Sequence, residues 1–325
     1  MDFKNIIGHE RVIETLKNAI RNNRIFHCYL FTGEESIGKK LVALAFAKAL
    51  LCKGKGVEPC NSCSSCLKFD KFNHPDLELI EPEKDLIPKQ RIDDLIKSMA
   101  IAPLESERRV VIIDECHKMG IEAQNELLKT LEEPPLYVNI ILITSNVNTL
   151  IPTILSRSQV IKFYPVENQK IVRLLREKFD KPLEEANFIA DFTKGCVGKS
   201  IELSQSEDFF NMREDALNTI HRIITGDKMN IMNSVSFFIE NKESIDKIMD
   251  IMLYWFRDLI IYKELGDSSL IVNKDKIQLL SSQTFLNKDR INDIIEYIMK
   301  TKEHMKNNVN FQLAIETMLL KIQEV

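Results

Sequence analysis

Short apolar runs alternate with longer mixed segments over the first half of the chain. Strands that are buried on both faces are apolar throughout, so these runs predict strands of a parallel sheet. The predicted strands are residues 26–31, 77–80, 110–113, 140–143 and 160–163. Helical periodicity is clearest at 41–52 and 120–133, where Pro134 and Pro135 end the second helix. This alternation predicts an α/β domain.

After Pro165 the sequence changes character, and helical patterns follow one another without a further predicted strand. Three helices, at 168–179, 184–193 and 199–206, predict a small helical unit. A larger helical unit is predicted from segments at 208–225, 231–240, 244–265 and 288–323, the last broken near 307–310. The pattern therefore predicts three domains with bounds 1–165, 166–207 and 208–325.

Composition narrows the class of protein. The chain has 325 residues, with 44% hydrophobic and 28% charged residues, which is typical of globular domains. No apolar run approaches the length of a membrane span, and the first residues lack the pattern of a signal peptide, so we expect a cytoplasmic protein with no membrane contact. The net charge of −4 argues against a dedicated DNA-binding protein, although a local basic face is compatible with it.

A glycine-rich loop follows the first predicted strand and precedes a predicted helix. Residues 33–39 fit the pattern G-x-x-x-x-G-K, in which backbone N–H groups surround a phosphate and the lysine reaches the terminal phosphates. We therefore expect Gly33, Gly38, Lys39 and Lys40 to line a nucleotide site. Lys40 stands where the pattern has serine or threonine, whose hydroxyl binds Mg²⁺. Weak hydrolysis is predicted even if Lys40 turns outward to solvent and nucleotide still binds.

Polar residues end two of the other predicted strands. Asp114 and Glu115 fit the Walker B pattern, in which the aspartate holds Mg²⁺ and the glutamate polarises the attacking water. The alternative for this pair is ordinary surface acids. Asn146 follows the next strand, where a side chain can sense a γ-phosphate; the alternative is a turn or helix cap.

Four of the seven cysteines lie within fifteen residues of one another. Cys52, Cys60, Cys63 and Cys66 supply the number of thiolates that a closed tetrahedral zinc site uses, and a reducing compartment favours metal over disulfides. Four protein ligands leave no open position, so the predicted zinc is structural. His74 is an alternative ligand.

Three stretches resemble bacterial DNA polymerase III clamp-loader subunits, which are AAA+ proteins. These stretches are Ile7-Gly8-His9-Glu10, residues 24–31 (RIFHCYLF) and residues 123–135 (AQNELLKTLEEPP). The resemblance covers the first two predicted domains, and weaker similarity continues at 255–259 and 308–314. It implies an α/β P-loop AAA+ domain with an inserted zinc module at 52–66, a small helical lid and an all-α collar domain that oligomerises.

Within this family, delta-prime subunits are stators, and gamma/tau subunits are the ATP-hydrolysing motors. Lys40 replaces the hydroxyl of the motor, and Gly198 stands where the motor has its sensor-2 arginine. We also expect no polymerase-binding extension of the tau kind after Val325. These features resemble the delta-prime type. The retained Walker B acids resemble the motor instead, and Lys199 could partly replace the lost arginine.

Arg157 gains meaning from the same resemblance. Residues 156–158 (Ser-Arg-Ser) match the family's Ser-Arg-Cys motif except at the last position. That motif supplies an arginine finger to ATP bound by the neighbouring subunit, where the guanidinium stabilises the charge of the transferring phosphoryl group. Because the guanidinium does the chemistry, the loss of the cysteine changes little.

The resemblance implies that the chain is an AAA+ scaffold that hydrolyses little ATP. It would be a subunit of the DNA polymerase III holoenzyme, which is a nucleotidyltransferase, but not the polymerase itself. The implied partners are the gamma/tau and delta subunits, the sliding clamp and, through the complex, primed DNA. The expected cofactors are structural zinc and ATP or ADP bound without efficient hydrolysis. Two alternatives are a gamma/tau-like motor and a zinc-containing DNA-binding module with a vestigial nucleotide fold.

Overall fold

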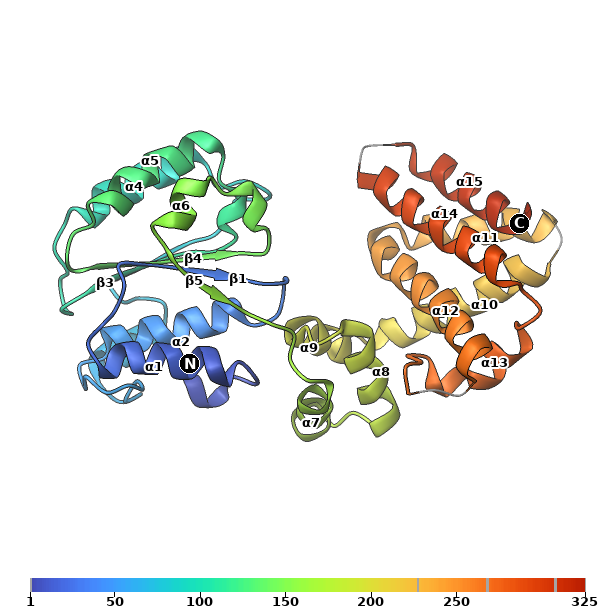
Figure 1. The fold of residues 1–325 in the computed structure, drawn as a ribbon, viewed down its shortest axis with the longest axis horizontal. Coiled ribbons are helices and arrows are strands. Elements are labelled where there is room, and N and C mark those ends of the chain that lie inside the picture. The colour runs from blue at the N-terminus through green and yellow to red at the C-terminus, as the bar shows by residue number, and fades with distance from the viewer. Residues whose placement is uncertain (1, 227, 267–268, 307–308, 325) are drawn as a thin grey trace. The chain divides into compact units, whose positions relative to one another are not determined.

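The computed structural model describes residues 2–226, 228–266, 269–306 and 309–324. The chain falls into two units, one of residues 1–174 and 193–201 and the other of residues 175–192 and 202–325 (Figure 1). The boundaries fall within or at the end of three helices: α7 (Asn168–Phe179), α8 (Leu183–Thr193) and α9 (Val197–Gln205). The predicted three-domain division, with bounds at 165 and 207, stays a prediction.

A five-stranded parallel sheet forms the centre of the first unit, and its strand order is β2-β3-β4-β1-β5. The strands are β1 (Cys28–Thr32), β2 (Leu77–Ile80), β3 (Arg109–Ile113), β4 (Val138–Thr144) and β5 (Gln159–Lys162). Each predicted strand is confirmed, with ends that differ by no more than two residues. The predicted α/β class with a parallel sheet is confirmed as well.

Helices cover both faces of this sheet (Figure 1). On one face lie α1 (Glu10–Arg21) and α2 (Lys39–Leu51); on the other lie α4 (Lys89–Met99), α5 (Ile121–Glu132) and α6 (Pro152–Ser156). Successive side chains of a strand point to opposite faces, so Tyr29 and Phe31 pack with α1 and α2, whereas Leu30 packs on the other side. The short α3 (Ser64–Asp70) lies in the cysteine-rich segment. Short 3-10 helices occur at Phe3–Asn5, Cys116–Lys118 and Val147–Thr149.

Strand register brings the polar strand ends together. Thr32 of β1 pairs with Thr144 of β4, and Ile80 of β2 pairs with Ile113 of β3. The residues that follow these strands therefore lie along one edge of the sheet, the usual ligand-binding edge of an open α/β sheet.

The second unit is helical. Its elements after α9 are α10 (Glu207–Thr225), α11 (Lys228–Glu240), α12 (Ile245–Leu265), α13 (Ile277–Ser282), α14 (Lys288–Lys306) and α15 (Phe311–Glu324), with 3-10 helices at Lys242–Ser244 and Lys274–Lys276. In its core, the indole of Trp255 donates a hydrogen bond of 2.9 Å to Gln283. The described residues after β5 contain no strand, as predicted. The predicted break at 307–310 falls partly on residues 307 and 308, which lie outside the described residues.

Helices of the second unit are too short or too polar to cross a membrane, and the same holds for every other helix within the described ranges.

Candidate functional site

The glycine-rich loop has the backbone geometry of a phosphate-binding loop. The loop begins at the end of β1 and ends at Gly38, which caps the N-terminus of α2. Gly38 has a φ of 110°, a backbone conformation that favours glycine. Gly33 lies so close to Phe163, the residue after β5, that a Cβ there would meet the Phe163 carbonyl oxygen at 2.8 Å. Ile37 is buried and anchors the loop in the core. These residues fit a phosphate at the N-terminus of α2.

Lys39 is held by the loop to which it belongs. The side chain is buried, and its ammonium donates hydrogen bonds to the carbonyl oxygens of Gly33 (2.7 Å) and Glu34 (2.5 Å). Desolvation lowers the pKa of Lys39 below its usual value. Binding a phosphate would require the ammonium to exchange these carbonyl oxygens for phosphate oxygens.

Lys40 does not turn away from the site. Its Nζ lies 3.1 Å from Asp114 Oδ2 and also bonds Glu81, which follows β2. Desolvation acts to lower the pKa of Lys40, but the hydrogen bonds to Glu81 and Asp114 outweigh it, and the pKa is raised. A fixed positive charge therefore contacts the acid that the Walker B pattern assigns to Mg²⁺. The residues at this edge fit a phosphate but do not fit the usual metal arrangement.

Glu115, the second Walker B acid, is also bound to a lysine. Its backbone has a φ of 48°, and its Oε2 lies 2.9 Å from Lys118 Nζ. Asp114 Oδ1 accepts a hydrogen bond of 3.0 Å from the Glu115 N–H. Both carboxylates thus have partners within the chain.

Asn146 acts as a cap in this structure. Its Oδ1 accepts a hydrogen bond of 3.1 Å from the Asn148 N–H at the start of a 3-10 helix. This observation favours the cap that the sequence left as the alternative, while the sensor role stays a prediction.

Helix α9 lies directly on the phosphate loop. The Gly198 N–H donates a hydrogen bond of 2.7 Å to the Ser36 carbonyl, and a Cβ at position 198 would lie 2.9 Å from the same oxygen. The Cys196 thiol donates to Glu34 over 3.5 Å. The sequence identifies Gly198 only as a missing arginine, because this contact depends on packing between distant segments.

Two further residues of this region contact the site, and no site role is predicted for them from the sequence. The His9 Nε2–H donates a hydrogen bond of 2.8 Å to the Ile37 carbonyl, and desolvation lowers the pKa of His9. Glu81 is the second partner of Lys40. The available signal for Glu81 is its position directly after a predicted strand, where parallel strands collect polar groups.

Arg157 ends α6 and faces α5 rather than its own phosphate loop. Its Nη2 lies 2.8 Å from Glu132, and its Nη1 donates to the Thr153 carbonyl at 3.3 Å and to the Ser156 hydroxyl at 3.4 Å. About a third of the side chain, 35%, is exposed. The guanidinium is therefore accessible from outside the chain while it is paired inside it.

The four predicted cysteines come together at the end of α2 and the start of α3. Their sulfur atoms all lie within 4.8 Å of one another, and Cys60 and Cys66 are 4.0 Å apart. Zinc with Zn–S bonds of about 2.3 Å needs sulfurs about 3.8 Å apart in a tetrahedron. The arrangement fits a closed metal site.

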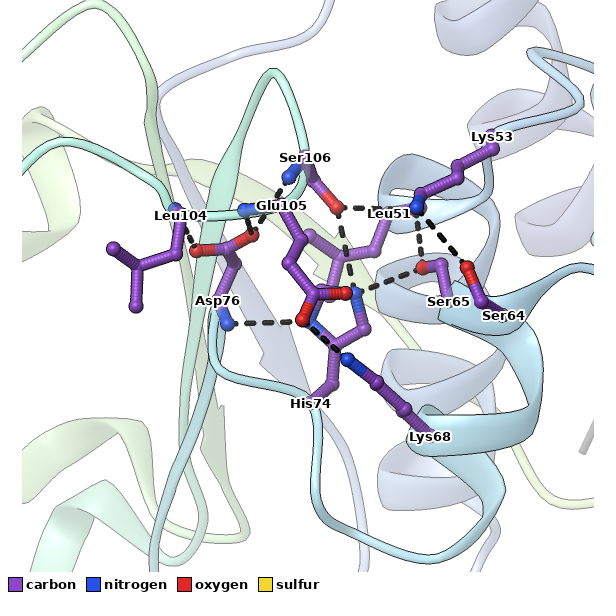
Figure 2. Close-up of polar contacts among 10 residues, drawn as sticks. All are labelled: Leu51, Lys53, Ser64, Ser65, Lys68, His74, Asp76, Leu104, Glu105 and Ser106. Carbon is purple, nitrogen blue, oxygen red and sulfur yellow. Dashed lines mark hydrogen bonds and ion pairs between the residues drawn. The ribbon is translucent and has the colours of Figure 1, made fainter.

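Backbone groups around the cysteines favour thiolates. The Gly54 and Cys60 N–H groups donate to Cys52, at 3.4 and 3.3 Å, and the Cys63 N–H donates to Cys60 at 3.4 Å. Hydrogen bonds from Ser62 and Cys63 lower the pKa of Cys60 to about 5. Desolvation instead raises the pKa of Cys66. His74 lies outside the cluster formed by the described residues, and both of its ring nitrogens have hydrogen-bond partners (Figure 2).

Comparison with known proteins gives matches over most of the chain. Residues 8–167 match the family described as DNA polymerase III, delta subunit, and residues 207–324 match the family described as DNA polymerase III, delta subunit, C terminal. The chain is 30% identical over 319 residues to DNA polymerase III subunit delta' of Bacillus subtilis, covering 97% of this chain and 96% of that protein.

Two other similarities are more distant. The chain is 28% identical to DNA polymerase III subunit tau of Bacillus subtilis, covering 98% of this chain but 61% of the length of tau. A solved gamma subunit-related protein from Thermotoga maritima is 18% identical, with a TM-score of 0.43, covering 96% of this chain and 98% of that one.

Alanine at position 198 is expected to destabilise the chain, against its usual effect in a helix. Alanine normally stabilises a helix by about 0.5–1 kcal/mol relative to glycine. Here its Cβ would force α9 from Ser36 and weaken the Gly198–Ser36 hydrogen bond. We expect the free energy of unfolding in urea to fall by about 1 kcal/mol. Lys199→Ala on the same turn is the control, and a gain in stability from Gly198→Ala would contradict the contact.

Proposed function

The chain belongs to the delta-prime family of DNA polymerase III clamp-loader subunits, and we propose that it serves the loader as a stator that does not hydrolyse ATP efficiently. The loader would place the sliding clamp on primed DNA, and this subunit would assemble with gamma/tau and delta subunits in the cytoplasm. The observation that carries the stator proposal is the contact of Lys40 with Asp114.

The charge at the sheet edge explains why hydrolysis would be weak. A motor needs Mg²⁺ to bridge the β- and γ-phosphates, with ligands from the loop hydroxyl and the Walker B aspartate. Lys40 removes the hydroxyl and places an ammonium on the Asp114 carboxylate. A divalent cation beside that ammonium would experience like-charge repulsion at short range. Asp114 and Glu115 are retained, but the acids alone do not rebuild the missing ligand.

Nucleotide itself remains compatible with the loop. Gly33, Gly38 and the N-terminus of α2 fit a phosphate, and Lys39 needs only to exchange loop carbonyls for phosphate oxygens. We therefore propose that ATP or ADP binds without strong dependence on Mg²⁺ and turns over slowly. Asn146 would lie near the terminal phosphate if it served as a sensor.

Replacing Lys40 with threonine is expected to make nucleotide binding depend on magnesium. The wild-type chain should bind a fluorescent ADP or ATP analogue equally well with Mg²⁺ or with EDTA, whereas Lys40→Thr should bind better with Mg²⁺. Lys40→Met, which removes the charge without adding a hydroxyl, is the matched control. Magnesium-dependent ATP turnover by the isolated wild-type chain at the rate of a motor subunit would overturn the stator proposal and favour the gamma/tau-like alternative.

Arg157 is proposed to act in the ATP site of a neighbouring subunit. Its guanidinium is partly exposed and points away from its own loop toward Glu132, which suits a group that is offered to another chain. Such an arginine would stabilise the charge that spreads over the transferring phosphoryl group.

Arg157→Ala is expected to lower ATP turnover in a loader reconstituted with gamma/tau and delta subunits. The site that the arginine serves should lose roughly 10³–10⁵ in rate, so the complex should lose that site's share of turnover and load the clamp more slowly. Because a partly exposed ion pair contributes about 0–1 kcal/mol, the variant should fold normally. Glu132→Ala frees the arginine and should retain turnover. Unchanged turnover with Arg157→Ala would remove the finger role.

The four-cysteine centre is proposed to hold a structural zinc ion. The sulfur separations and the N–H···S hydrogen bonds support four thiolate ligands, and four ligands leave no position for a reacting water. The zinc would link the end of α2 to α3 and stabilise a segment with little apolar core of its own.

Purified protein is expected to contain about one zinc per chain, as a four-thiolate site requires. Cys60→Ser should lower the zinc content, while Cys196→Ser, outside the cluster, should keep it. Removal of the metal with a chelator should lower the midpoint of thermal unfolding, since structural metal binding contributes to folding. A metal-free chain that is as stable as the metal-loaded chain would refute the structural role.

The third function, a DNA-binding module, has less support. The net charge of −4 does not favour DNA binding, and both faces of the sheet are buried in the core. Tight, salt-dependent binding of DNA by the isolated chain would be the result that supports it.

A further inference from the structure

A buried polar network (Figure 2) includes the residues that precede Cys52 and Cys66, and nothing in the proposed functions uses it. His74 is 4% exposed, Ser65 is 1% exposed and Asp76 is fully buried. Burying such groups costs free energy unless each finds a hydrogen-bond partner. The network is therefore a specific arrangement whose partners can be followed atom by atom.

The hydrogen bonds fix the tautomer of His74. The Asp76 N–H can only donate, and it lies 3.1 Å from Nδ1, so Nδ1 is the acceptor. In a neutral ring the proton is then on Nε2, which lies 2.8 Å from the Ser65 hydroxyl and donates to it. Ser65 in turn donates to the Leu51 carbonyl at 2.6 Å. The result is a directed relay from His74 through Ser65 to Leu51.

The last hydrogen bond of the relay joins the two segments that carry Cys52 and Cys66. Leu51 is the last residue of α2, and Cys52 follows it; Ser65 lies in α3, and Cys66 follows it. The Ser65–Leu51 hydrogen bond therefore joins the backbone just before one cysteine to the residue just before another. It links the segments that carry Cys52 and Cys66 without touching either sulfur.

The other side of the network is anchored to the sheet. The Asp76 carboxylate, just before β2, accepts hydrogen bonds from the N–H groups of Leu104 (2.5 Å), Glu105 (2.9 Å) and Ser106 (2.8 Å), just before β3. The Ser106 hydroxyl also lies 3.3 Å from the Leu51 carbonyl and 3.4 Å from His74 Nε2. Figure 2 shows that this loop and α3 both approach His74.

We propose that His74 is a positioning residue for the four-cysteine centre: through Ser65 and the Leu51 carbonyl it holds Cys52 and Cys66 at the spacing a metal requires. The inference rests on the proposed zinc site and deepens it. His74 is not proposed as a metal ligand, since both of its ring nitrogens have hydrogen-bond partners in the network. Residues that orient ligands from outside the coordination shell raise metal affinity because they reduce the rearrangement needed on binding.

The test is metal affinity of the full chain, measured with Zn²⁺ by competition with a chromophoric chelator and with Co²⁺ by its absorption spectrum. His74→Ala and Ser65→Ala should each weaken binding by roughly 10-fold or more, the scale found when such supports are removed. The Co²⁺ spectrum of the saturated variants should keep the thiolate charge-transfer intensity of four sulfurs. His74→Gln should recover part of the affinity, because its amide supplies both an acceptor and a donor.

Two control variants separate positioning from general loss of stability. Ser64→Ala removes the neighbouring hydroxyl of α3, which bonds the exposed Lys53, and should leave affinity unchanged. Asn139→Ala removes the hydrogen bonds that the buried Asn139 of β4 makes with Phe26 and Arg108, so it should lower stability without lowering metal affinity. If His74→Ala does not fold, Ser65→Ala decides the question, since it loses a single hydroxyl.

The outcomes are distinguishable from failure of the zinc site itself. Wild-type protein that takes up neither ion would remove the zinc proposal and this inference together. Wild-type protein that binds normally, with His74→Ala and Ser65→Ala both equal to Ser64→Ala, would overturn the positioning role alone. A saturated His74→Ala spectrum that has lost a ligand would also overturn it, because His74 would then bind the metal directly.

Discussion

Parallel pairing of the strands places their carboxyl ends along one edge of the sheet, and the chemistry of that edge follows from this constraint. β1 leads into the phosphate loop, β2 leads into Glu81 and β3 leads into Asp114. Because α2 starts from the same edge, Lys40 in its first turn reaches both carboxylates. The topology thus gathers acids that would attract a divalent cation and supplies a cation from the chain itself.

Several charged and polar groups of the loop are bound within the chain. Lys39 bonds loop carbonyls, Lys40 bonds two acids and Ser36 receives the Gly198 N–H from α9. A phosphate that binds at the N-terminus of α2 must therefore compete with the internal partners of the two lysines. A loop of this kind is compatible with the proposed stator role.

Much of the fold can be predicted from the sequence, and the reasons are local. The strands are short β-branched runs, and Pro134 with Pro135 marks a helix end. Helices α1, α3, α4, α6 and α13 lie outside the predicted segments. In α4, for example, the apolar positions Ile92, Leu95 and Met99 have helical spacing, but polar residues surround them and hide the pattern. The cysteine cluster is predictable because its four cysteines are close in sequence. The partners of Lys40 and the backbone contact of Gly198 lie on distant segments, so the spacing of residues in the sequence does not predict them. The same holds for His74, whose partners are separated from it by up to 32 residues.

One helix joins the two candidate centres. α2 begins at Lys39 in the phosphate loop and ends at Leu51, directly before Cys52. A helix of this length spans about 20 Å and behaves as a stiff rod, because its hydrogen bonds resist stretching. A metal site tolerates changes in ligand distance of only about 0.2 Å. A metal bound at the cysteines would therefore clamp the far end of the rod, and any tilt or twist of α2 at the phosphate loop would have to carry the whole cysteine module with it. With a metal bound, the loop and the cysteine module would therefore move together, although their chemistry is unrelated.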